Sequence, residues 1–89
     1  MRAVVTVIGK DMVGILAKVS NMCAKANANV TDVTQSVLQD VFAMIMIIDI
    51  DNLNCELGAL TDQMEALGVE NNLSIKVMHE DIFNSMHRI

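Results

Sequence analysis

The segment best suited to chemistry is the loop over residues 9–14, which leaves a β-branched run and enters a helical pattern. Asp11 offers a carboxylate, and Gly14 leaves room for a ligand or another backbone to approach closely. The backbone N–H groups at the start of a helix favour a carboxylate or a phosphate. Together these groups suit a zwitterion, whose carboxylate binds the amides and whose ammonium group meets Asp11. Spacing alone favours the other interpretation, a tight strand-to-helix turn.

Other reactive side chains are scattered along the chain. Cys23 and Cys55 lie too far apart for a paired-thiol metal site, and two cysteines make neither an iron–sulfur cluster nor a disulfide scaffold. We expect Cys23 in the core and Cys55 as a partly buried small residue. His79 and His87 have no second ligand at zinc spacing, so packing or surface positions are favoured. The sequence therefore predicts no catalytic residue, no metal, no cofactor and no enzyme.

The composition excludes several further functions. Of the 89 residues, 53% are hydrophobic and 19% charged, which excludes a disordered chain. A net charge of −5 and an aromatic content of 2% leave neither a basic surface nor stacking side chains for nucleic acid. The longest apolar run, Val41–Ile48, is too short to span a membrane, and no signal-peptide pattern opens the chain. We expect a cytoplasmic protein with neither nucleic acid nor membrane as a partner.

The elements that position the loop follow from the spacing of apolar residues. β-branched residues predict a strand over 2–8 that ends at Gly9. Apolar residues at helical spacing predict a helix over 12–27, for which Asp11 is a suitable N-cap. Two strands are predicted next, joined by a short turn, over residues 28–38 and 41–50.

The second half of the chain repeats the pattern. Asn54 is expected to cap a helix that continues through Leu67, with Gly68 as its C-terminal stop. A strand over 72–79 and a short helix over 81–89 follow. This order predicts an α+β fold, a ferredoxin-like βαββαβ sandwich in one domain over 1–89. The core of that domain spans 1–80, and the terminal helix spans 81–89.

The same residues resemble a known family. Residues 6–19, with the sequence TVIGKDMVGILAKV, are similar to the opening of an ACT domain. Ala28-Asn29-Val30 is similar to the start of its second strand. Residues 81–89 resemble the ending of a family of small stand-alone bacterial and archaeal ACT proteins of unassigned function. That family is similar to the ACT halves of a glycine-cleavage transcriptional regulator, and the resemblance covers the whole chain.

This resemblance implies a regulatory domain that binds an amino acid or a similar small metabolite. Such domains usually act as dimers, with the ligand at the interface near the first loop. The residues it places at the ligand, together with a nearby polar strand residue, are Asp11, Met12, Val13, Gly14, Asn29 and Gln35. Because Val13 stands where the family often has Pro, ligand specificity does not carry over. The chain shows no fused catalytic or DNA-binding domain, so any output must pass to a separate partner protein.

Two of these residues have an alternative interpretation of equal weight. Gln35 is the one polar member of the Val33–Val37 row, and it suits a dimer interface, a ligand or a solvated strand position. Asn29 suits either of two roles, contact with a ligand or the tight turn that leads into its strand. For the whole protein, the alternative function is a ligand-free module for protein interaction or dimerisation.

The predicted strand over 41–50 is apolar on both faces. One face carries Phe42, Met44, Met46 and Ile48, and the other carries Val41, Ala43, Ile45 and Ile47. The helices can cover only one face, and a half-solvated strand should alternate apolar and polar residues. Large exposed apolar patches usually mark interfaces. We therefore expect a homodimer in which the second face is covered by the other copy.

Overall fold

The computed structural model describes residues 1–10 and 13–86. Its strands and helices follow one another in the order that the periodicity of the apolar residues predicts. They are β1 (Arg2–Gly9), α1 (Ile15–Lys25), β2 (Asn29–Leu38), β3 (Val41–Asp49), α2 (Leu57–Glu70), β4 (Ser74–His79) and α3 (Glu80–Met86).

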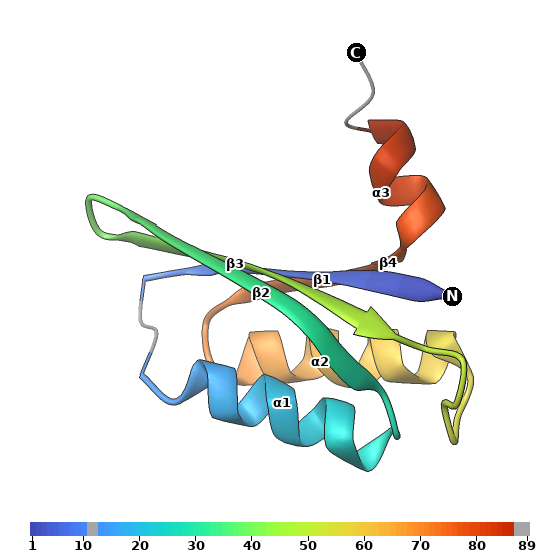
Figure 1. The fold of residues 1–89 in the computed structure, drawn as a ribbon. Coiled ribbons are helices and arrows are strands. Elements are labelled where there is room, and N and C mark those ends of the chain that lie inside the picture. The colour runs from blue at the N-terminus through green and yellow to red at the C-terminus, as the bar shows by residue number, and fades with distance from the viewer. Residues whose placement is uncertain (11–12, 87–89) are drawn as a thin grey trace.

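The four strands form one antiparallel sheet in the order β2-β3-β1-β4. Helices α1 and α2 cover one face of this sheet, and α3 rises from the other side (Figure 1). The outer strands are therefore β2 and β4. This is the predicted ferredoxin-like βαββαβ sandwich with a short C-terminal helix, and the prediction is confirmed.

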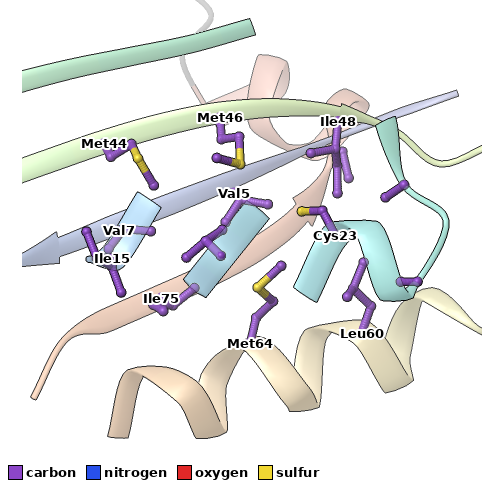
Figure 2. Packing of buried hydrophobic residues seen from close by; sticks show 14 of the residues in the cluster. Val5, Val7, Ile15, Cys23, Met44, Met46, Ile48, Leu60, Met64 and Ile75 are labelled. Atoms are coloured by element: carbon purple, nitrogen blue, oxygen red, sulfur yellow. The ribbon is translucent and has the colours of Figure 1, made fainter. Parts of the chain in front are cut away.

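The core lies between the sheet and helices α1 and α2. Figure 2 shows Met44, Met46 and Ile48 of β3 pointing toward the helices, with Leu60 and Met64 of α2 facing them. The predicted division of the β3 side chains between two faces is therefore correct. On its other face, Val41 and Ile45 are each 40% exposed. We call that side of the sheet the free face.

The two long helices begin and end at other residues than predicted. Helix α1 begins at Ile15, and the position before it is Gly14, with φ 72° in the left-handed region. Asp11, the predicted N-cap, lies outside the described residues, and the N-cap position of α1 is Gly14. The N-cap position of α2 is Glu56. The predicted cap, Asn54, uses its side chain elsewhere.

Gly68 lies inside α2 and does not end it, since the helix continues to Glu70. A Cβ at Gly68 would lie 2.7 Å from the carbonyl oxygen of Leu73. The backbone amide of Leu73 donates a hydrogen bond to the carbonyl of Gly68, 2.8 Å away. Gly68 is therefore needed for close packing of the helix against the strand entry, and the predicted stop was wrong.

Candidate functional site

The loop between β1 and α1 is described on either side of Asp11 and Met12, which lie outside the described residues. Val13 is 84% exposed, and Gly14 is exposed with nothing within 4 Å of the place where a Cβ would lie. The carbonyl of Gly14 accepts a hydrogen bond from the amide of Lys18 at 3.1 Å, which closes the first turn of α1. No side chain among the described residues caps this helix start, and its first turn has no acidic residue. Backbone amides at the start of a helix favour an anionic group.

Gln35 lies at the same end of the sheet as this loop. In the register, Gln35 is opposite Met44, and Met44 is opposite Val7. Figure 2 shows Val7 beside Ile15, the first residue of α1. Because Met44 belongs to the core, Gln35 shares the helix-bearing side of the sheet, and it is exposed there. The structure therefore brings Gln35 and Gly14 to one end of the molecule.

Asn29 lies at the opposite end. It is opposite Asp49, which is opposite Arg2, whereas Gly9 is opposite Phe42 at the far end of β1. Arg2 and Gly9 are seven steps apart along β1, and at a rise of about 3.3 Å per residue these steps span roughly 23 Å. One copy of the chain thus keeps Asn29 away from the Gly14 loop.

The end of the sheet that holds Asn29 is charged. The N-terminal ammonium group of Met1 lies 2.6 Å from a carboxylate oxygen of Asp51, and that hydrogen bond raises the pKa of the amine. Arg2 pairs with Glu80 of α3 at 2.5 Å. Both of these basic groups are therefore paired with carboxylates of the same chain.

Both cysteines and His79 have structural positions in the fold. Cys23 is fully buried, and burial raises the pKa of its thiol, which makes the reactive thiolate rarer. Cys55 is partly buried against the core, as predicted. The Nδ1 atom of His79 accepts a hydrogen bond from the amide of Asp81 at 3.1 Å, at the start of α3. His87 lies outside the described residues. Within 1–10 and 13–86, no three potential ligands gather as a metal site requires.

A second candidate feature is a hollow on the free face, with a volume of about 280 Å³. Its walls come from three strands and from α3, and they consist of Thr6, Ile8, Ala43, Met44, Ile45, Met78 and Phe83. The apolar run of β3 predicted an apolar surface here. That α3 would form one wall was not predicted, although its apolar residues at helical spacing were the available signal. No helix in the described part of the chain is both long and apolar enough to cross a membrane.

Comparison with known proteins identifies the family. The ACT-domain family model matches residues 2–78. A UPF0237 protein of Methanopyrus kandleri is 43% identical over 88 residues, covering 99% of this chain and 98% of that protein. A UPF0237 protein of Clostridium perfringens is 44% identical over 89 residues and covers both chains completely.

Solved structures agree with this result. An ACT domain protein from Streptococcus pneumoniae superposes with a TM-score of 0.81 at 35% identity, covering 93% of each chain. A structure assigned to a glycine cleavage system transcriptional repressor shares the fold, with a TM-score of 0.73 at 21% identity, over 85% of this chain and 43% of that one. ACT domains are generally regulatory domains that bind small ligands. The chain belongs to the ACT-domain family.

Proposed function

We propose that this chain is a non-catalytic regulatory domain of the cytoplasm that binds an amino acid, or a similar small zwitterion, at the start of α1. The observation that carries the proposal is the open space at Gly14, in front of a helix start that no described side chain caps. Amides at such a position bind a carboxylate, because the N–H groups have no partner within the helix and the helix dipole adds positive charge. The chain then passes its signal to a separate protein.

The residues on either side of Gly14 complete the proposed site. Val13 and Gly14 present backbone amides, and Asp11 supplies a carboxylate for the ammonium group of the ligand. Met12 contributes backbone and an apolar side chain. Gln35, exposed at the same end of the sheet, offers one amide donor and one carbonyl acceptor.

Asn29 joins this site only through a second copy of the chain. Strand β2 is an edge of the sheet, with one side of its backbone unpaired in the sheet. Two such edges related by a two-fold axis perpendicular to the sheet pair antiparallel. That pairing brings the start of one β2 to the end of the other, and so carries Asn29 of the partner subunit toward the Gly14 loop. We infer a homodimer with the ligand between the two copies.

Exposed apolar side chains support an interface on this side. Leu16 on α1 is 41% exposed and Val37 on β2 is 57% exposed, and both lie toward the loop end of the molecule. Unpaired edge strands are usually protected by charge, by Pro or by a covering element. Between Val33 and Leu38 strand β2 has neither Pro nor a charged residue. A second copy covers this edge in the proposed dimer.

Subunit complementation tests this arrangement directly. Asp11→Ala and Asn29→Ala should each abolish binding, because each removes one half of both sites in a dimer of identical copies. Mixing the two variants after unfolding and refolding together should restore one intact site in every mixed dimer. Isothermal titration with the amino acid that binds the wild type measures the recovery. If both variants fold and dimerise but the mixture stays inactive, Asn29 does not act across the interface.

A further inference from the structure

The hollow on the free face lies apart from the proposed ligand site at the start of α1. It has a volume of about 280 Å³, on the side of the sheet opposite helices α1 and α2 (Figure 1). An apolar cavity of about 150 Å³ is enough to hold a molecule of the size of benzene. The hollow therefore has room for a small apolar molecule, although it is below the size of an ordinary drug-binding pocket.

Helix α3 forms one wall of the hollow, and two contacts at its start hold it on the sheet. Arg2 of β1 forms an ion pair with Glu80. The Nδ1 atom of His79 accepts a hydrogen bond from the amide of Asp81. Phe83, three residues after Glu80, then contributes its side of the wall. The wall is thus formed by the chain itself, so a ligand has little conformational entropy to overcome when it binds.

The strand registers give the pattern of side chains around the hollow, because residues directly opposite each other point to the same side of a sheet. One row across the free face consists of Thr34 on β2, Ile45 on β3, Thr6 on β1 and Lys76 on β4. The two central strands carry no charged residue over 4–8 or 41–47. The middle of the face is therefore apolar, and its charged groups lie on the outer strands.

Lys76 is the basic residue of this row. Its place opposite Thr6 puts the two Cβ atoms about 5 Å apart. Its ammonium group lies 4.0 Å from a carboxylate oxygen of Glu65, and the two side chains are 61% and 46% exposed. An ion pair of this length between exposed groups is weak. Because β4 is an outer strand, Lys76 can leave Glu65 and turn across the free face.

The other edge of the face has the opposite charge. Strand β2 has no basic residue, and Asp32 lies opposite Ile47 on the free face. An anionic group is therefore attracted to the β4 side and repelled from the β2 side. Between the two edges, Ile8 and Ile45 are 51% and 40% exposed, which leaves apolar surface for the rest of a ligand.

We propose that the hollow binds a small carboxylate with an aliphatic chain, of the chemical class of a short fatty acid. The chain of the ligand lies against Ile8, Ile45 and Phe83. Its carboxylate pairs with the ammonium group of Lys76 and accepts a hydrogen bond from Thr6, which alone among the lining residues has a hydroxyl. A carboxylate suits this surface better than a second copy does, because a two-fold axis near Thr6 would bring two Lys76 side chains together.

Methyl NMR of the whole chain, titrated with butanoate, hexanoate and octanoate, tests the proposal. The methyl resonances of Ile8 and Ile45 should shift with octanoate, whereas that of Leu60, buried on the other side of the sheet, should not. Each added methylene should strengthen binding by about two- to fourfold, since the hollow buries the chain only in part. Octylamine should bind more weakly than octanoate, because its ammonium group meets Lys76.

Two variants locate the two ends of the ligand. Ala43→Leu should fill the hollow and abolish the shift of Ile8, with the fold checked by circular dichroism. Lys76→Gln should weaken octanoate by about three- to fivefold and leave octanol binding unchanged. Lys25→Gln is the matched control, because it removes the same charge at the end of α1, on the other side of the sheet.

The outcomes separate this site from the one at the start of α1. An amino acid bound there should leave the methyl groups of Ile8 and Ile45 unshifted. If octanoate does not shift them, or if Lys76→Gln weakens octanoate and octanol equally, the carboxylate site is wrong, whatever the amino acid titration shows. Shifts of the same methyl groups on raising the protein concentration without ligand would also overturn it, since a second copy would then occupy the face.

Discussion

The side-chain amide of Asn54 donates a hydrogen bond to the carbonyl of Lys25, 2.7 Å away. Lys25 is the last residue of α1, so this bond satisfies a carbonyl that has no partner within the helix. The backbone amide of Asn54 also donates to the carbonyl of Ala26, at 3.1 Å. Asn54 thus joins the end of α1 to the segment that leads into α2, and it holds the two helices in place under the sheet.

Replacing Asn54 should therefore lower the free energy of unfolding, although Asn54 lies outside both helices. Asn54→Ala removes the bond to Lys25, and a hydrogen bond of this kind contributes about 1 kcal/mol to the free energy of unfolding. Asn52→Ala is the control, because only the backbone carbonyl of Asn52 takes part in a neighbouring bond, with Asn27. Urea unfolding followed by circular dichroism compares the two. Equal stability of both variants would contradict the role given to Asn54.

The two glycines of α2 should respond in opposite directions to alanine. Gly68→Ala forces a Cβ to within 2.7 Å of the Leu73 carbonyl oxygen, and overpacking of this kind costs about 1–3 kcal/mol. Gly58→Ala meets nothing within 4 Å and should gain up to about 1 kcal/mol from helix propensity. Thermal unfolding of the pair measures both effects. A stabilised Gly68→Ala variant would show that the helix can move away from the strand entry.

The conformation of Gly14 predicts a different response at the loop. Gly14→Ala meets no neighbour, but a φ of 72° places Ala in the left-handed region at a cost of about 1–2 kcal/mol. Asn tolerates this conformation better than Ala, so Gly14→Asn should lose less stability. Chemical unfolding of the two variants checks the order. If Ala proves the better replacement, the backbone at this position is not fixed in the left-handed region.

Burial of Cys23 predicts how stability changes in mild alkali. Its pKa is raised by burial above the ordinary value of 9.0, so the folded state keeps the proton longer than the unfolded state does. The stability that this difference in pKa contributes is fully present below pH 9, the ordinary pKa of the thiol. It is lost as the pH rises toward the raised pKa of the folded state. The amine of Met1, whose pKa is raised by its bond to Asp51, acts in the same direction.

The free energy of unfolding should therefore fall as the pH rises above about 8, and no tyrosine contributes to this fall because the chain has none. Cys23→Ala should make this fall shallower. Urea unfolding at a series of pH values gives the slope of the free energy of unfolding against pH. Identical slopes for the wild type and Cys23→Ala would contradict the assignment.

The order of elements could be predicted from the sequence because each strand and helix repeats its apolar residues with its own period. The ends of the helices could not, since they depend on contacts between distant residues. A glycine such as Gly68 is typical of the end of a helix. Here it is needed inside α2, where the carbonyl of Leu73 approaches closely. Asn54 suits an N-cap, but its side chain bonds to the end of another helix.

The candidate site stays a prediction, and the sequence and the structure each supply a different part of it. The residue types of the first loop identify an open helix start, and the structure places Gln35 at the same end of the sheet as Gly14. The pairing of Asn29 with Asp49 puts that residue at the other end. Only the direction of β2 and its place at the edge show that a second copy is needed to bring Asn29 to the loop.

Calorimetric titration with the common amino acids tests the central claim most directly. We expect selective binding of at least one of them by the wild type, loss of that binding in Asn29→Ala, and retention of it in Asn52→Ala. At a concentration of 100 times the dissociation constant, the ligand should also stabilise the fold by about 2.7 kcal/mol. Absence of binding across the panel, or undiminished binding in Asn29→Ala, would contradict a zwitterion site shared between two copies.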